Sequence, residues 1–125
     1  MSNFIEIKNL KKTFNISSNN QLLLFENLNL NISKNSTTSI IGPSGCGKST
    51  LLNIVGLLDS SFHGEYFFDG ILINNINKSK LNEIKNLKIG FVHQFFHLIP
   101  ELSVMENIIL PALIKKDKIS DINND

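Results

Sequence analysis

The 125 residues are enough for one domain with a hydrophobic core. The formal net charge of +1 excludes a field that would attract nucleic acid or an acidic membrane surface. The single cysteine excludes an internal disulfide, and no apolar run approaches the ~20 residues of a membrane helix. Near the start, Glu6 and Lys8 would interrupt a signal peptide, so we expect a cytoplasmic protein that meets any membrane through a partner.

The N-terminal part of the chain predicts two antiparallel strands. Residues 4–10 alternate apolar and polar side chains, as a half-buried strand does, and residues 17–20 form a turn cluster. Residues 22–32 continue the alternation as a second strand region. The apolar run at residues 37–41 predicts a buried strand, and an apolar helix is expected from about residue 49 to residue 57.

The middle of the chain predicts a hairpin, a helix and a short strand. Residues 64–73 form the hairpin, because Asp69-Gly70 between two apolar runs is a strong turn signal. Residues 80–88 carry apolar side chains at helical spacing. Residues 89–92 are apolar and predict another strand, which leads into the C-terminal third of the chain.

The last predicted element is a helix over residues 103–109. Ser103 would cap its first turn, and Glu106, three residues later, completes the pattern of a capping box. We expect Pro111 to end this helix, because proline in a helix interior removes a hydrogen bond and clashes with the preceding turn. The tail from Lys115 is polar and is expected to fray.

A phosphate-binding motif lies between the run at residues 37–41 and the helix that follows. Gly42, Gly47, Lys48 and Ser49 meet the pattern G-x-x-x-x-G-K-[ST]. The glycines let backbone N–H groups converge on phosphate oxygens, and the helix N-terminus adds further donors. The lysine would neutralise phosphate charge, and the serine hydroxyl can ligate Mg²⁺. A plain glycine-rich turn is the alternative, but the strand–loop–helix context favours a phosphate site.

The whole loop is expected to contact a nucleotide through its backbone and its side chains. Cys46 occupies an unspecified position of the motif, where a redox switch and a tolerated small residue are the alternatives, and we favour the small residue. The nucleotide-binding residues expected in the loop are Gly42, Pro43, Ser44, Gly45, Cys46, Gly47, Lys48, Ser49 and Thr50.

The loop sequence GPSGCGKS also suits guanylate kinases, so a nucleotide kinase is one alternative. A nucleotide kinase usually opens directly with the strand before this loop, whereas two predicted strands come first here. Downstream, residues 89–111 have the sequence IGFVHQFFHLIPELSVMENIILP. With this segment the chain resembles the ATP-binding subunits of ABC transporters, most closely the lipoprotein-releasing and macrolide-exporter-like subfamily. The resemblance extends from Ile5 to about Asn123.

The resemblance implies a fold and further site residues. The fold would be an α/β P-loop NTPase, in which an antiparallel β subdomain joins an incomplete RecA-like core. Phe14 matches the aromatic position that stacks on adenine, although tyrosine is commoner there. Gln94 matches the glutamine that reaches Mg²⁺ and senses the γ-phosphate, so the Mg²⁺ ligands would be Ser49 and Gln94. Taken alone, Phe14 also suits a core position and Gln94 a polar strand end.

Three positions depart from the family pattern. Asn35 stands where glycine is frequent, Lys85 replaces a frequent arginine, and His63 replaces a serine. His93 and His97 are four residues apart, but a zinc pair at this spacing needs a helix, and this segment predicts a strand passing into a loop. The two phenylalanines between them are expected to pack, or to form part of a docking groove for a transmembrane partner.

The rest of the family's catalytic apparatus is absent from these residues. No glycine follows Gly90, so there is no Ser-Gly-Gly-Gln-like signature, and no strand ending in Asp-Glu and no histidine after His97 occur. We therefore expect one incomplete ATP-binding domain over residues 1–125, in which Lys48 and Gln94 would assist but no catalytic set is complete. Apolar strands without their neighbours would leave the isolated chain marginally stable and prone to aggregate.

The resemblance also implies a cellular role. The intact subunit would couple ATP binding and hydrolysis to transport, with lipoprotein release from the inner membrane as one task. ATP and Mg²⁺ would be its cofactors, and transmembrane permease subunits and a second ATP-binding subunit its partners. Through them it would lie on the cytoplasmic face of the inner membrane. The alternative is a nucleotide-binding remnant, or a split-gene product, that holds ATP without hydrolysing it.

Overall fold

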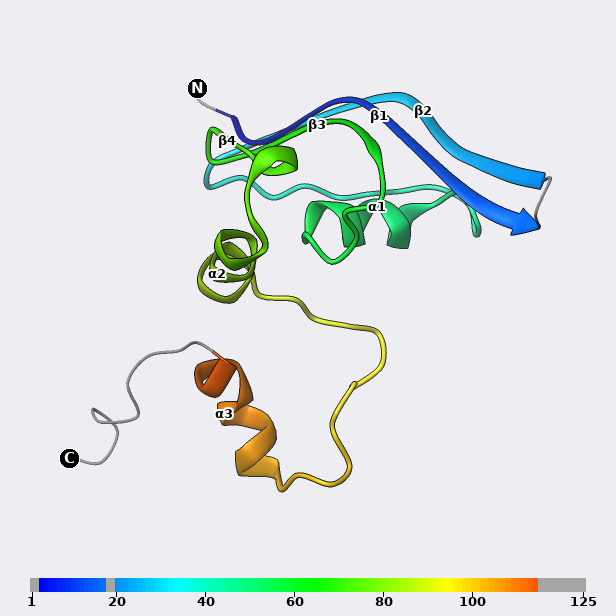
Figure 1. Cartoon of the computed structure of the whole chain (residues 1–125). Helices are drawn as coiled ribbons and strands as arrows, with labels where there is room; N and C mark the ends of the chain where they lie inside the picture. Colours follow the sequence, from blue (N-terminus) through cyan, green and yellow to red (C-terminus); the bar gives the residue numbers. More distant parts are fainter. Residues whose placement is uncertain (1–2, 18–19, 115–125) are drawn as a thin grey trace. The chain divides into compact units, whose positions relative to one another are not determined.

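The computed structural model describes residues 3–17 and 20–114. The chain divides into two compact units, Met1–Leu81 and Asn82–Asp125. The first unit holds an antiparallel sheet and helix α1, and helix α2 begins at its end (Figure 1). The second unit holds the rest of α2 and helix α3. Within the described residues, no helix is both long and apolar enough to cross a membrane.

The sheet has four strands in the order β2-β1-β3-β4, and each neighbouring pair is antiparallel. Strands β1 (Asn3–Ser17) and β2 (Asn20–Ser33) confirm the two strands predicted before the phosphate loop, and both are longer than the sequence indicated. Strand β3 (His63–Phe68) pairs with the other edge of β1. The turn predicted at residues 17–20 includes two residues that lie outside the described part of the chain.

One extra residue in β1 explains why the alternation in the sequence changes near residue 10 although the strand continues. Its pairing with β3 shifts register after Lys8, where Asn9 has a φ of 52°. An extra residue in one strand exchanges the faces on which all later side chains lie. The buried positions therefore change from odd to even numbers, with Ile7 before the bulge and Leu10 and Lys12 after it.

The predicted Asp-Gly hairpin is confirmed. Strand β4 (Ile71–Leu72) pairs antiparallel with β3, and the two residues between them are Asp69, with a φ of 47°, and Gly70, with a φ of 78°. Positive φ at both central residues is what a tight hairpin turn of this kind requires. A short 3-10 helix, η1 (Ile73–Asn75), follows β4.

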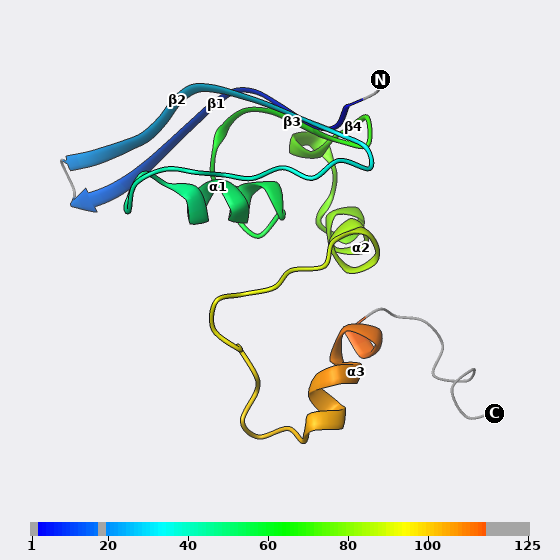
Figure 2. The same cartoon turned by 180° about the vertical axis from the view of Figure 1, so that it is seen from behind.

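Helix α1 (Lys48–Val55) lies along one face of the sheet, as two opposite views show (Figures 1 and 2). The Tyr66 hydroxyl of β3 donates a hydrogen bond of 2.6 Å to the carbonyl oxygen of Val55 and so joins sheet to helix. Burial raises the pKa of the Tyr66 hydroxyl. The buried apolar residues of this unit are Ile5, Ile7, Leu10, Leu51, Ile54, Leu57, Tyr66, Phe68 and Ile73.

Two predicted strands are wrong. Residues 37–41 and 89–92 form no strand, and none of the described residues pairs with either run. Ile41 is 91% exposed and Val92 is 94% exposed. A strand is stabilised by backbone hydrogen bonds to a neighbouring strand, so an apolar run without such a partner stays irregular however strand-like its composition is.

The capping box in the second unit is confirmed. Helix α3 (Val104–Ile114) begins directly after Ser103, whose backbone N–H donates to Glu106 Oε2 at 2.7 Å. In return the Glu106 N–H donates to Ser103 Oγ at 3.3 Å. These hydrogen bonds with Ser103 lower the pKa of the Glu106 carboxyl. Helix α2 (Lys78–Lys88) confirms the helix predicted over residues 80–88.

The prediction that Pro111 ends the last helix is wrong. Proline costs a helix one hydrogen bond but keeps a helical φ, so a helix can pass through it when the rest of that turn is held. Here the Asn86 side-chain amide of α2 donates a hydrogen bond of 2.8 Å to the Pro111 carbonyl oxygen. The tail from Lys115 lies outside the described residues.

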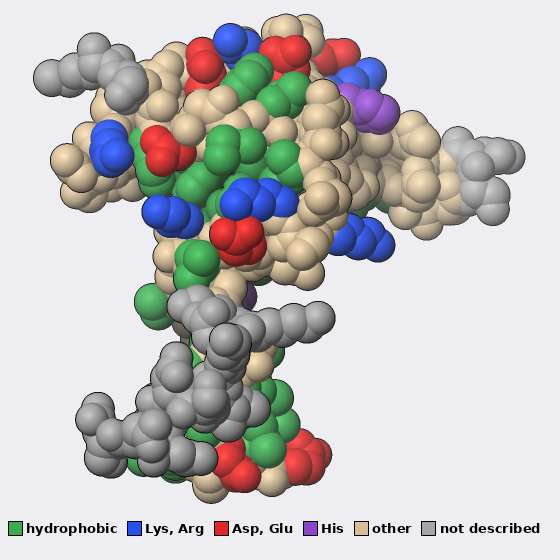
Figure 3. All heavy atoms as spheres, turned by 60° about the vertical axis from the view of Figure 1, so that its left-hand side comes forward, with side chains coloured by type: hydrophobic (Ala, Val, Ile, Leu, Met, Phe, Trp, Pro, Cys, Tyr) green, Lys and Arg blue, Asp and Glu red, His purple; other side chains and the backbone are tan. Residues whose placement is uncertain are grey.

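Apolar side chains also reach the surface of the molecule. Figure 3 shows them beside lysines and acidic residues, so the face in view carries charges of both signs close together. In the second unit Phe95 is 70% exposed and Phe96 is 92% exposed. The packing predicted for these two phenylalanines is therefore absent within their own unit.

Candidate phosphate-binding site

The phosphate loop runs from residue 42 to the start of α1 at Lys48. Gly45 has a φ of 80° and Gly47 a φ of 97°, a left-handed region in which glycine is the favoured residue. Gly47 is the N-cap of α1, and no side chain caps the helix there. The first N–H groups of a helix have no partner within it, so these donors stay available to an anion.

Strand β2 presses against the loop at Gly47. A Cβ atom at this glycine would lie 2.7 Å from Cζ of Phe25 and 3.0 Å from Cδ2 of Leu24. Adjacent side chains normally point to opposite faces of a strand, but the pairing of Lys12 with Phe25 and of Thr13 with Leu23 leaves Leu24 as an extra residue. This bulge in β2 lets both side chains reach Gly47, which therefore cannot carry a side chain without displacing them.

The Lys48 ammonium group lies across the loop. Its Nζ atom donates to the carbonyl oxygens of Gly42, at 2.9 Å, and Pro43, at 2.7 Å. It also lies 3.9 Å from Sγ of the exposed Cys46. An ammonium group has three donors, so Lys48 can hold the loop closed through its carbonyl groups and still offer a positive charge to a phosphate.

Ser49 and Thr50 follow Lys48 in the first turn of α1. Ser49 is exposed, and Thr50 is half-buried. A Mg²⁺ ion bound with substrate phosphates takes few protein ligands and keeps several waters, so a single exposed hydroxyl beside the loop suits it. Within the described residues, no group of three or more His, Cys, Asp or Glu side chains forms a separate metal site.

Phe14 lies in β1 on the same face as Lys12, two residues further along. Its position opposite Leu22 follows directly on the bulge where β2 meets Gly47. Two residues of a strand span about 7 Å, so Phe14 lies about that far along β1 from Lys12, which pairs with the Phe25 that contacts Gly47. Phe14 is 41% exposed, and the Lys12 Nζ atom lies 4.9 Å from its ring centroid. An exposed ring face is what stacking on a base requires.

Sequence reasoning missed Lys12, which is 3% exposed. Its Nζ atom lies 2.7 Å from Asp59 Oδ2 and donates a hydrogen bond of 2.6 Å to the Ser61 carbonyl oxygen. Burial alone would raise the Asp59 pKa, but hydrogen bonds from Lys12 and from the Ser61 N–H outweigh it and lower that pKa. The available signal was a lysine at a core-facing position, which only the bulge at Asn9 reveals.

Gln94 belongs to the second unit and is exposed there. Its role toward Mg²⁺ and the γ-phosphate stays a prediction. On either side of it, the His93 and His97 rings lie 4.5 Å apart between centroids, and His97 has a φ of 49°. Two histidines do not complete a metal site, and no third ligand joins them within the described residues.

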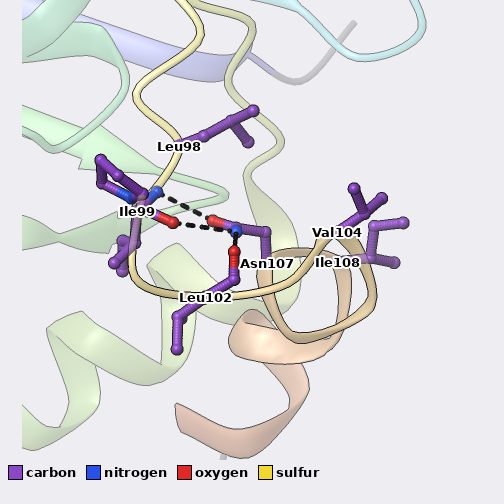
Figure 4. Close-up of a pocket in the computed structure, with 7 residues that line it drawn as sticks. Leu98, Ile99, Leu102, Val104, Asn107 and Ile108 are labelled. Atoms are coloured by element: carbon purple, nitrogen blue, oxygen red, sulfur yellow. Dashed lines mark hydrogen bonds between the residues drawn. The ribbon is translucent and has the colours of Figure 1, made fainter.

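A pocket of about 270 Å³ also lies in the second unit (Figure 4). The Asn107 side-chain amide is the polar group in its wall, and it is saturated by the backbone. Its Oδ1 accepts from the Ile99 N–H at 2.9 Å, and its Nδ2 donates to the carbonyl oxygens of Ile99, Leu102 and Ser103. With no polar group left over, the pocket is an apolar surface rather than a nucleotide site.

The chain is similar to known proteins over most of its length. The family described as ABC transporter matches residues 25–125. The lipoprotein-releasing system ATP-binding protein LolD of Syntrophus aciditrophicus is 43% identical over 110 residues, which cover 88% of this chain and 49% of LolD. The macrolide export ATP-binding/permease protein MacB of Mannheimia succiniciproducens is 40% identical over 111 residues, which cover 89% of this chain and 17% of MacB.

A solved structure has the same fold. The cassette MJ0796 of Methanocaldococcus jannaschii, a dimer in a post-hydrolysis state bound to ADP and Pi, aligns with a TM-score of 0.80 and 43% identity. The alignment covers 89% of this chain and 47% of the cassette, so the chain spans about half the length of this relative and of LolD. The predicted P-loop α/β fold is confirmed. The chain belongs to the ABC transporter family, among the ATP-binding proteins of the LolD and MacB type.

Proposed function

We propose that residues 1–125 form part of one ATP-binding domain of an ABC transporter and that they bind ATP together with Mg²⁺. The observation that carries the proposal is the Lys48 ammonium, held at 2.9 Å and 2.7 Å from two carbonyl oxygens of its own loop, beside an uncapped helix N-terminus. Positive charge and unpaired N–H donors converge at one place, as a polyphosphate requires. The MJ0796 structure supports this, since it is bound to ADP and Pi.

Each site residue has a proposed role. Backbone N–H groups of the loop and of the first turn of α1 bind phosphate oxygens, and Lys48 neutralises their charge. Ser49 ligates Mg²⁺ beside the loop, and the Mg²⁺ role that the family resemblance implies for Gln94 stays a prediction. Phe14 stacks on adenine. When bound, the metal ion neutralises charge on the terminal phosphates, while the chain's own groups orient them.

The intact protein is proposed to couple ATP binding and hydrolysis to transport. LolD belongs by name to a lipoprotein-releasing system, which supports lipoprotein release as its task. MacB carries an ATP-binding part and a permease part, which supports transmembrane permease subunits as partners. The dimeric MJ0796 structure supports a second ATP-binding subunit as another partner. The protein would then lie on the cytoplasmic face of the membrane through its permease.

The test is the affinity of the full chain for ATP with Mg²⁺, measured by equilibrium dialysis. Lys48→Ala removes the charge that faces the phosphates and is expected to weaken binding at least tenfold, because charged hydrogen bonds to phosphate are worth about 1.5–3 kcal/mol. Lys34→Ala is the matched control, since Lys34 is an exposed turn residue outside the loop. Equal affinities for the Lys48 variant and the unchanged chain would refute the phosphate site.

A further inference from the structure

Lys12 is the one charged side chain that is buried among the described residues. Burying an ammonium group is unfavourable unless each of its donors finds a partner. Its three donors face three partners, namely the Asp59 carboxylate at 2.7 Å, the Ser61 carbonyl oxygen at 2.6 Å and the Phe14 ring, whose centroid is 4.9 Å away. The third partner sets this group apart from an ordinary buried ion pair.

The anchors of Lys12 follow the helix that begins at the phosphate loop. Asp59 and Ser61 lie a few residues beyond the end of α1 at Val55, and the Asp59 carboxylate is itself held by a hydrogen bond of 2.8 Å from the Ser61 N–H. Lys12 therefore ties β1, which carries Phe14, to the segment that carries the phosphate loop at its other end. This tie fixes the position of the Phe14 ring relative to the phosphate loop.

The ammonium also covers part of the Phe14 ring. The Lys12 Nζ atom lies over the ring, 4.9 Å from its centroid, and Phe14 is still 41% exposed, so part of the side chain stays accessible to a ligand. The faces of aromatic rings are electron-rich and repel one another when stacked. A cation on the far side draws that density away, which lowers the repulsion between the ring and a purine.

We propose that Lys12 is a positioning residue for the adenine base, acting through Phe14. Its ammonium, fixed by Asp59 and Ser61, holds the ring in place and prepares its open face for stacking. This inference rests on the proposed ATP binding, and it assigns to Lys12 a share of the affinity for the base and none of the affinity for the phosphates.

The experiment compares two ligands of the full chain, ATP with Mg²⁺ and inorganic tripolyphosphate with Mg²⁺, by equilibrium dialysis. Lys12→Met is expected to weaken ATP binding about three- to tenfold and to leave tripolyphosphate binding within about twofold, since one stacked pair contributes on that scale. Lys11→Met is the matched control, because it removes the same charge from an exposed neighbour that pairs with Glu26 at 4.0 Å. It should change neither affinity.

Two further variants separate positioning from a general structural role. If Lys12 acts through the ring, Phe14→Ala combined with Lys12→Met should lose no more ATP affinity than Phe14→Ala alone. Asp59→Asn loosens the anchor while leaving the lysine in place, and it should lower the preference for ATP over tripolyphosphate in the same direction. If circular dichroism shows that Lys12→Met does not fold, the Asp59→Asn variant alone tests whether Lys12 positions the ring.

The outcomes are distinct. Failure of the unchanged chain to bind either ligand overturns the proposed function itself. Binding of both ligands, with the preference for ATP unchanged in Lys12→Met or in Asp59→Asn, overturns the role of Lys12 alone. Additive losses in the double variant with Phe14→Ala would show that the lysine acts by another route than the ring, which also overturns the proposal.

Discussion

Gly47 is the residue at which the sheet and the phosphate loop meet. It combines a left-handed φ of 97° with a contact that leaves no room for a Cβ atom beside Phe25. The motif in the sequence explains the first property, since a loop that turns its N–H groups inward needs glycine. The lack of room for a Cβ atom is not predicted by the motif, because it depends on a bulge in β2 some twenty residues earlier in the chain.

The two properties can be separated by substitution. Gly47→Ala is expected to destabilise the chain by roughly 1–3 kcal/mol, because strain and a clash add. Gly45→Ala is the control, since Gly45 has a φ of 80° but nothing within 4 Å of its Cβ position, and it should cost about 1 kcal/mol. Urea unfolding followed by circular dichroism measures both. Equal losses would show that the contact with Phe25 has no energetic weight.

At the scale of elements, strand β3 and helix α1 are joined by the Tyr66 hydroxyl, buried and bonded to Val55 O at 2.6 Å. Its position in β3 follows from the alternation of the predicted hairpin, but its partner lies in an element on the other side of a loop. The irregular run at residues 37–41 shows the same dependence. Local apolar composition favoured a strand there, and no described strand pairs with it.

Tyr66 is the sole tyrosine of a chain without tryptophan, so its ionisation can be followed by ultraviolet absorbance. Burial raises its pKa above the ordinary value of 10.0, so the folded chain should keep it protonated where an exposed tyrosine ionises. A raised folded-state pKa means that stability is intact below pH 10 and falls as the pH rises further. A reversible titration near pH 10 with the fold intact would contradict this.

At the scale of the whole molecule, apolar surface decides how an isolated polypeptide of residues 1–125 behaves. Ile41, Val92 and Phe96 are each more than 90% exposed. Exposed apolar patches promote association. We expect the mass measured by sedimentation velocity to rise with concentration, and a monomer that unfolds cooperatively at every concentration would contradict the expectation.

The sequence by itself determined the features that depend on neighbours along the chain. The phosphate loop, the Asp69-Gly70 turn and the capping box at Ser103 each follow from a φ requirement or a hydrogen bond spanning a few residues. The family resemblance followed from the sequence of residues 89–111 together with the loop and the strands predicted before it. Only the tertiary structure decided the burial of Lys12 against Asp59 and the failure of the run at residues 37–41 to form a strand. These outcomes depend on partners distant in sequence, because burial and strand pairing are properties of the packed fold and not of a local segment.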